Sequence, residues 1–508
     1  MTQVASVEVF RRRASHSVAG QRGALLCALL IIAVFVCAIG SLTAGAISLA
    51  LTSAATLLVA WIVFQVGSAL LPTSLCFRLL VCVYAGQSLA QLLLALFGQT
   101  RSPTGGWGMD LADHSGVLAL GEWSLLAGTL LAATMWGLLT HRTRRPSLNL
   151  TQHSTTRTRF VLIAALFLHI SRLLLALALP ASLVWVSNLL TEDLEAVGFF
   201  VGWFAGDLGA AANAVVLSAL AMNCVVGALL GTRYPTVLLG LYVAGRLVSP
   251  HERHRRRLIF ASLAALVPLF LLFSLVGDVR VRRGRNSLDL LGISQLSGFA
   301  DEIAVSRSDY QARDTDPIAN TLNRLYAWPN AASTVLTPDP IPYRGFAAWA
   351  SDCRPYLQIG TWGADGRQRF FASGFGTQHA SDYGFMNVIG STSEFGVLAD
   401  GWSTAGPVGV LVLGFLVVMA LCMSEYVVLY SVGLSYTGKL VFLCILMKAC
   451  LHCNGYPTPL VIRYILLYTV FWALILKILD ALSGYNPGTV RKHSRHSMAR
   501  MGKPTSGE

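Results

Sequence analysis

Long runs of hydrophobic residues, separated by short polar connections, dominate the chain. Several runs reach the roughly 20 apolar residues that a helix needs to cross the ~30 Å hydrocarbon layer of a membrane. In lipid only helices and closed barrels satisfy the backbone, and barrel strands would be short and alternating. We therefore expect an all-α polytopic membrane protein of about ten spans. The expected spans lie near residues 24–41, 45–66, 75–98, 116–139, 160–180, 207–230, 258–277, 406–430, 438–453 and 461–481.

This pattern divides the chain into four parts. Residues 1–277 form an N-terminal membrane bundle of about seven spans, and residues 278–405 form one large extracytoplasmic loop of mixed, irregular structure. Residues 406–481 form a C-terminal bundle of about three spans, and residues 482–508 are a basic tail.

Two regions fit this pattern poorly. Residues 181–206 carry acids and an aromatic string, and we interpret them as an external interfacial segment. Residues 235–249 are apolar but too short to cross, which indicates an interfacial or re-entrant helix.

Basic residues set the orientation, because Lys and Arg collect on the cytoplasmic side of membrane proteins. The basic clusters lie at residues 11–13, 141–146, 251–257 and 491–496. With ten spans, all four clusters fall on one side. Both termini are therefore expected in the cytoplasm, and the large loop outside it.

The composition agrees with this interpretation. Hydrophobic residues make up 54% of the chain and charged residues only 12%, whereas soluble domains carry roughly 25%. The formal charge of +13 reflects basic residues at helix ends, so we expect no nucleic-acid partner. The chain has no GxxxxGK[ST] phosphate loop, which argues against an ATP-driven pump. We expect no metal, because the string CLHC at residues 450–453 lacks a second ligand pair.

The large loop has a composition suited to binding. It contains 11 Arg and no Lys, together with several Trp. Arg forks grip phosphate in a bidentate way, and we expect aromatic faces to stack on sugar rings. The alternative is that the aromatic residues form the loop's own core. The candidate substrate-binding residues of the loop are Arg344, Arg354, Arg367, Arg369, Trp349, Trp362 and Trp402.

Three residues are candidates for a catalytic base. His379 lies between Gly-rich strings, and an imidazole with a pKa of ~6.5 can accept the proton of a sugar hydroxyl. A histidine in a loop is more often structural. Glu394 and Asp400 are the acidic candidates.

Of the basic residues that fall inside expected spans, two are candidates for substrate binding. Ionisable residues at bilayer depth are costly and mark functional sites. Arg172 lies in the fifth span and can pair with Asp207 or hold a lipid-linked pyrophosphate. Lys448 lies deep in the ninth span, and we assign it to substrate binding as well.

The string ADGWSTAGPVGV at residues 399–410 adds a resemblance to a known family. It resembles the opening of the helix after the large loop in Wzy-type polymerases of O-antigen or exopolysaccharide repeat units. In that family an acidic residue is followed by an aromatic two positions later and then by Gly-x-x-Gly-Val. Here these positions are Asp400, Trp402, Gly406, Gly409 and Val410. The order of spans around one late external loop is similar to the family too.

The resemblance implies a metal-independent glycosyltransferase without cofactors. It would join polyprenyl-pyrophosphate-linked oligosaccharides at the periplasmic face of a bacterial inner membrane. The expected partners are this lipid-linked oligosaccharide, membrane lipid, a chain-length regulator and a flippase.

Two alternatives remain. An O-antigen ligase or another polyprenyl-linked glycosyltransferase shares the general shape, but ligases usually follow the loop histidine closely with Asn, whereas Ala380 and Ser381 follow His379. A glycolipid transporter or flippase would be expected to have repeated halves, and no internal repeat is evident.

Overall fold

The computed structural model describes ten stretches of the chain, and all of their regular elements are helical. These stretches are residues 44–71, 74–98, 100, 111–140, 156–171, 194–229, 234–249, 343–357, 396–453 and 458–482. The α-helices are α2 (Ala44–Leu70), α3 (Leu75–Leu96), α4 (Ser115–Thr140), α5 (Thr156–Ile170), α8 (Val197–Trp203), α9 (Ala210–Leu229), α10 (Tyr234–Val248), α15 (Gly345–Leu357), α18 (Val397–Tyr426), α19 (Tyr436–His452) and α20 (Thr458–Leu482). A short 3₁₀ turn, η2 (Ala205–Asp207), precedes α9, and a π turn, η5 (Val427–Ser431), ends α18.

The prediction of a multi-pass, all-helical membrane protein is confirmed for this part of the chain. Five of the described helices are long and apolar enough to cross a membrane: α2, α3, α4, α20 and α18 with its π turn. They coincide with the expected spans near residues 45–66, 75–98, 116–139, 406–430 and 461–481. Helices α5, α9 and α19 overlap the expected spans near 160–180, 207–230 and 438–453 but are shorter than the five long helices. The expected spans near 24–41 and 258–277 lie outside the described residues.

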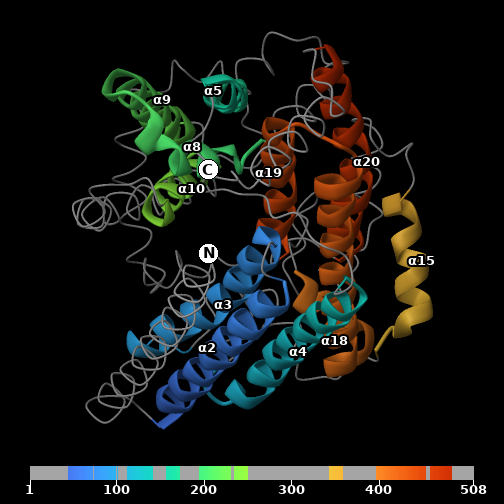
Figure 1. The fold of residues 1–508 in the computed structure, drawn as a ribbon. Helices are drawn as coiled ribbons and strands as arrows, with labels where there is room; N and C mark the ends of the chain where they lie inside the picture. Colours follow the sequence, from blue (N-terminus) through green and yellow to red (C-terminus); the bar gives the residue numbers. More distant parts are fainter. Residues whose placement is uncertain are drawn as a thin grey trace, which may run out of the picture.

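Helices α2, α3 and α4 form a first group, drawn in blue and cyan in Figure 1. Helix α3 begins where Ser74 accepts a hydrogen bond from the backbone N–H of Phe77 at 3.2 Å. Cross-helix contacts such as Ser48 to Ser115, at 2.8 Å between their hydroxyl oxygens, place α4 along α2. Small residues allow these backbones to approach closely, as is usual between membrane helices.

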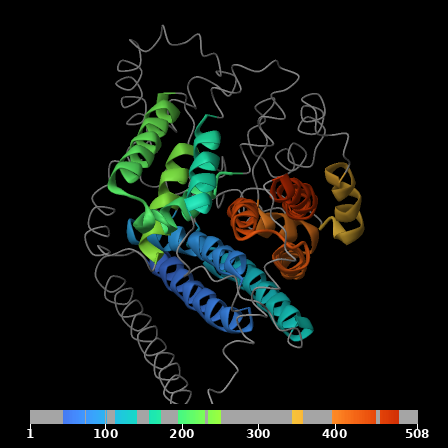
Figure 2. The ribbon, with the colours of Figure 1, turned by 45° about the horizontal axis from the view of Figure 1, so that its top comes forward.

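The C-terminal helices α18, α19 and α20 form a second group, which Figure 2 shows nearly end-on. Helix α18 also packs along α4, where Gly128 meets the backbone of Leu411. Ser435 caps α19 by accepting from Gly438 N at 3.0 Å, and Asp480 of α20 accepts from the Ser435 hydroxyl at 2.6 Å. Helix α19 contacts both α3 and α20, so it links the two groups.

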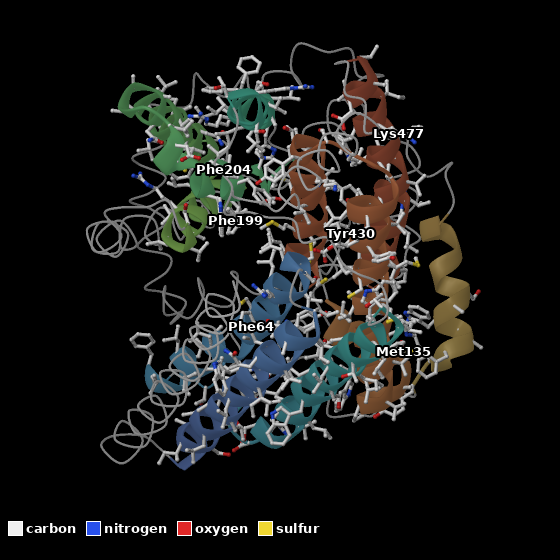
Figure 3. The ribbon with its side chains drawn as sticks, viewed as in Figure 1. Phe64, Met135, Phe199, Phe204, Tyr430 and Lys477 are labelled. Atoms are coloured by element: carbon white, nitrogen blue, oxygen red, sulfur yellow. The ribbon has the colours of Figure 1, made fainter. Side chains whose placement is uncertain are left out.

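Helices α5, α8, α9 and α10 form a third group. Helices α8 and α10 touch through glycines: Gly202 faces the backbone of Tyr242, and Gly245 faces that of Phe199. Phe204 is buried beside them (Figure 3). The apolar segment 235–249 is helical, as expected, and forms most of α10.

The outer faces of these groups carry large apolar side chains. Met135, Leu138 and Leu474 are exposed although they lie on apolar helices; Met135 is labelled in Figure 3. A soluble protein rarely exposes so much apolar surface, whereas lipid tails can cover it. This pattern agrees with helices that cross a membrane.

Helix α18 differs from the expected boundary between loop and span. We placed residues 397–404 in the large loop, but they form two helical turns. The helix breaks at Ala405 and Gly406, where Gly406 takes a φ of +60° before Pro407. The chain then folds back, so that Gly401 lies against Gly409 and Val410.

Two glycines make this fold-back possible. A side chain at Gly409 would collide with the carbonyl oxygen of Gly401, and a side chain at Gly401 would meet Val410 Cα at 2.5 Å. Glycine is also the residue that adopts a positive φ without steric cost. The glycines that open the expected span therefore form a broken helix rather than a straight one.

We predict that Gly409→Ala lowers the stability of the purified protein, because its methyl group has no space between the two halves of α18. Overpacking of this kind costs about 1–3 kcal/mol. The measurement is the thermal unfolding temperature in detergent. Gly116→Ala in α4 is the matched control, since no atom lies within 4 Å of the added carbon. Equal unfolding temperatures for the two variants would contradict the fold-back.

Candidate functional site

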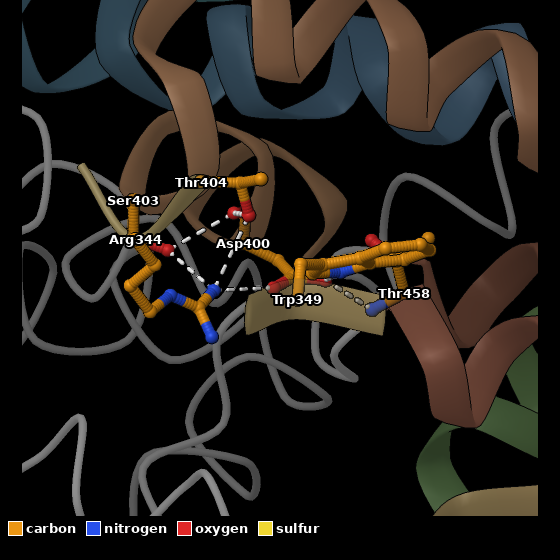
Figure 4. A network of polar contacts seen from close by, with 6 residues as sticks. All are labelled: Arg344, Trp349, Asp400, Ser403, Thr404 and Thr458. Carbon is orange, nitrogen blue, oxygen red and sulfur yellow. Dashed lines mark hydrogen bonds and ion pairs between the residues drawn. The ribbon is translucent and has the colours of Figure 1, made fainter. Parts of the chain in front are cut away.

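The site centres on the carboxylate of Asp400, which is fully buried. Arg344 Nη2 donates to Oδ1 at 3.0 Å, forming an ion pair. Trp349 Nε1 donates to Oδ2 at 3.2 Å, and the backbone N–H of Thr458 donates to the same oxygen at 2.9 Å. Figure 4 shows these contacts converging from three segments. One carboxylate thus joins α15, α18 and the first residue of α20.

Arg344 makes further contacts with the same turn of α18. Its Nη2 lies 2.9 Å from Ser403 Oγ and 3.3 Å from Thr404 Oγ1, and its backbone N–H donates to Ser403 O at 3.1 Å. The Arg344 side chain is 22% exposed, so the ion pair lies at the edge of the buried region. The residues just before α15 are therefore fixed to the broken helix by backbone and side chain together.

The local sequence explains why this turn of α18 can hold a charged group. Asp400 lies in the first turn of the helix, where a negative charge interacts favourably with the helix dipole. Ser403 and Thr404 donate their hydroxyls back to the Asp400 carbonyl at 2.9 and 2.7 Å. This arrangement leaves their oxygens as acceptors for Arg344.

The two described tryptophans of the site contribute to hydrophobic packing. Trp349 and Trp402 both pack, half-buried, against the hydrophobic core. Trp402 turns towards α4, where a carbon added to Gly121 would lie 3.6 Å from its ring. These contacts favour the alternative in which the loop aromatics build a core.

A second charged cluster lies beside the first. His452 Nε2 of α19 lies 3.6 Å from Oε2 of Glu195, a residue just before α8, and this distance is longer than that of an ordinary hydrogen bond. Lys448 and His169 act electrostatically on the same carboxylate. Lys448 is 3% exposed, and its Nζ lies 5.4 Å from the centre of the Tyr464 ring.

A backbone hydrogen bond connects the two clusters in space. The backbone N–H of Val397, three residues before Asp400, donates to the carbonyl of Cys453 at 3.0 Å. Cys453 directly follows His452. The end of α19 therefore lies against the start of α18.

Glu195 lies outside the five long spans, and its pKa is below the ordinary value of 4.5. Burial by itself would raise this pKa by disfavouring the charged form. The His452 ring and the charges of His452, Lys448 and His169 lower it, and their combined effect exceeds that of burial.

The structure brings together three of the predicted site residues: Asp400, Arg344 and Trp349. Lys448 belongs to the neighbouring cluster, and Trp402 faces α4. Arg354 lies within α15, although its side chain is not among the described ones. The other predicted residues lie outside the described part of the chain: His379, Glu394, Arg172, Arg367, Arg369 and Trp362.

Several partners in these clusters are not among the predicted residues. Ser403 and Thr404 lie three and four residues after Asp400, one helical turn away, and their hydroxyls were the available signal. The backbone N–H of Thr458 carries no sequence signal at all. The pairing of Glu195 with His452 joins residues far apart in the chain. Across the described stretches, no group of three His, Cys, Asp or Glu side chains is placed to hold a metal ion.

Comparisons with protein-family models, with curated proteins and with solved structures give no match for this chain.

We predict that Trp349→Phe destabilises the protein by about 1–2 kcal/mol, because it removes one donor from a buried charged acceptor. Trp123→Phe is the matched control: its indole N–H donates at 2.9 Å to the neutral hydroxyl of Thr56 at a more exposed site. Thermal unfolding of both variants provides the comparison. A larger loss for Trp123→Phe would show that the Trp349 hydrogen bond contributes little.

We predict a loss of stability at acid pH that depends on Glu195. A carboxyl whose pKa is lowered in the folded protein stabilises it above the unfolded value, near 4.5, and this contribution disappears as the pH falls through the folded value. Unfolding temperatures measured across this range should fall more steeply for the wild type than for Glu195→Gln. Parallel curves would contradict the pairing with His452.

Proposed function

We propose that the protein polymerises polyprenyl-pyrophosphate-linked oligosaccharides. The observation that carries the proposal is the broken helix α18, because all five positions of the family-like string contribute to it. Gly406 makes the turn and Gly409 the close approach, while Val410 is buried against Gly401. Asp400 and Trp402 hold the first half of the helix against α15 and α4.

The charges around this helix suit a pyrophosphate donor. Arg344 stands at the edge of the buried region, and Lys448 lies in the cluster next to the start of α18. A pyrophosphate group carries negative charge that grows on the leaving oxygen as the glycosidic bond breaks. Fixed positive groups stabilise such developing charge strongly where water is excluded.

In the proposed reaction a hydroxyl of the acceptor sugar attacks the anomeric carbon of the donor. The bond from that carbon to the pyrophosphate oxygen breaks, polyprenyl pyrophosphate leaves, and a base accepts the hydroxyl proton. Pyrophosphate is a good leaving group, so correct positioning of the two substrates supplies much of the acceleration.

The contacts of Asp400 favour a positioning role over that of the base. Its oxygens already accept hydrogen bonds from Arg344, Trp349 and Thr458, and the side chain is fully buried, so neither oxygen faces a substrate hydroxyl. We therefore assign the base to His379 or Glu394. Asp400 and Arg344 then hold the large loop in place over the membrane helices.

Deletion of the gene in its host tests the function. Loss of a polymerase should leave single repeat units on the acceptor or the lipid carrier, as seen by gel analysis of the surface glycan. Long polymer retained on the carrier would indicate a ligase, and units trapped inside the cell a flippase. Surface polymer of normal length in the deletion strain would contradict the proposal.

Point variants in the complemented strain test the loop. His379→Ala and Arg354→Ala should shorten the chains without lowering the amount of protein in the membrane, which immunoblotting measures. Polysaccharide chains of wild-type length in both variants would show that these two residues take no part in the reaction.

A further inference from the structure

A separate buried carboxyl lies among the spans of the first group. Glu122 of α4 is 5% exposed. Gln91 Nε2 donates to its Oε1 at 2.6 Å, and Ser88 Oγ donates to its Oε2 at 3.0 Å. Ser53 of α2 donates to Gln91 Oε1 at 3.2 Å, which extends the network to a third helix. Three long apolar helices therefore enclose one acidic group.

Glu122 has no ion pair with any residue in the described stretches, unlike Asp400. Helix α2 has no charged residue, and Asp400 of α18 pairs with Arg344. Arg78 of α3 lies near Glu425 of α18, whose carboxylate accepts from Ser74 at 2.5 Å. An ionised carboxylate is costly inside a membrane without a positive partner, and none of the described side chains supplies one to Glu122, which favours a cation of another kind.

The surroundings of Glu122 are rich in oxygen. Ser53, Ser88 and Gln91 are all buried and contribute hydroxyl or amide oxygens. Gln87 is buried one turn before Gln91 on the same face of α3, and its Oε1 has no hydrogen-bond partner in the described structure. An unsatisfied buried oxygen calls for an explanation, and a bound cation supplies one. Hard monovalent cations are coordinated by such oxygens.

We propose that Glu122 binds one exchangeable monovalent cation, a proton or a sodium ion, between α2, α3 and α4. In the proton form the carboxyl is neutral. On release the O–H bond breaks, the proton passes to water, and the carboxylate keeps the hydrogen bonds from Gln91 and Ser88. In the sodium form the ion replaces the proton and takes oxygens of Glu122 and its neighbours as ligands. This site is independent of the proposed polymerase reaction.

Carbodiimide modification of the purified full-length protein tests the site. Dicyclohexylcarbodiimide reacts with protonated carboxyls in apolar surroundings, and peptide mass spectrometry locates the modified residue. The reaction is followed over a range of pH in choline chloride and in sodium chloride. We expect Glu122 to be modified in choline chloride, at a rate that falls as the pH rises. Well above its titration point, each further pH unit lowers the protonated fraction about tenfold.

The two salts distinguish the two cations. Slower modification in sodium chloride identifies a sodium site, and equal rates identify a proton site. Glu425, measured in the same samples, is the internal control for a buried carboxyl with a positive neighbour, and its rate should not respond to sodium. Absence of modification at Glu122 in choline chloride, or a rate independent of both pH and sodium, would overturn the proposal.

The variant Glu122→Gln separates binding from folding. The amide copies the shape of the neutral carboxyl, so we expect an unfolding temperature close to that of the wild type at neutral pH. If this site binds the cation, the unfolding temperature of the wild type depends on sodium or on pH. We expect the unfolding temperature of the variant to lack that dependence. The same dependence in the variant would show that Glu122 is not the site.

Discussion

The fold-back of α18 at Ala405 and Gly406 is the constraint on which the described C-terminal half depends. It turns the first two helical turns against the following ones, and this buries Asp400. A buried carboxylate must find donors, and the nearest are Arg344 before α15 and the first N–H of α20. The backbone turn at Gly406, together with the close approach of Gly401 and Gly409, thereby determines which segments of the chain meet.

The buried carboxyl groups have different kinds of partner in different parts of the described structure. Asp400 is paired with Arg344 at the edge of the core, and Glu195 lies beside His452, with Lys448 acting electrostatically on the same carboxylate. Glu122 has only neutral partners among the described residues. Because a membrane tolerates unpaired charge poorly, the first two arrangements are suited to holding segments together. The third is suited to taking up and releasing a cation.

The sequence predicted much of the helical architecture, because long apolar runs have few alternatives in lipid. It named Arg344 and Trp349 as candidates for substrate binding and Asp400 as a candidate base, but it gave no sign that these three residues contact one another. It placed residues 397–404 in the loop, since a run containing Asp400, Gly401 and Ser403 does not resemble a span. The break itself depends on a backbone contact between Gly401 and Gly409, and hydrophobic periodicity carries no information about such contacts.

The Arg344–Asp400 ion pair fastens the start of α15 to the broken helix α18. A double-mutant cycle tests it most directly. The unfolding free energies of wild type, Asp400→Asn, Arg344→Gln and the double variant are compared in detergent. A direct pair predicts that the double variant loses less than the two single losses added together, with a coupling of about 0.5–3 kcal/mol. Strictly additive losses would contradict the account.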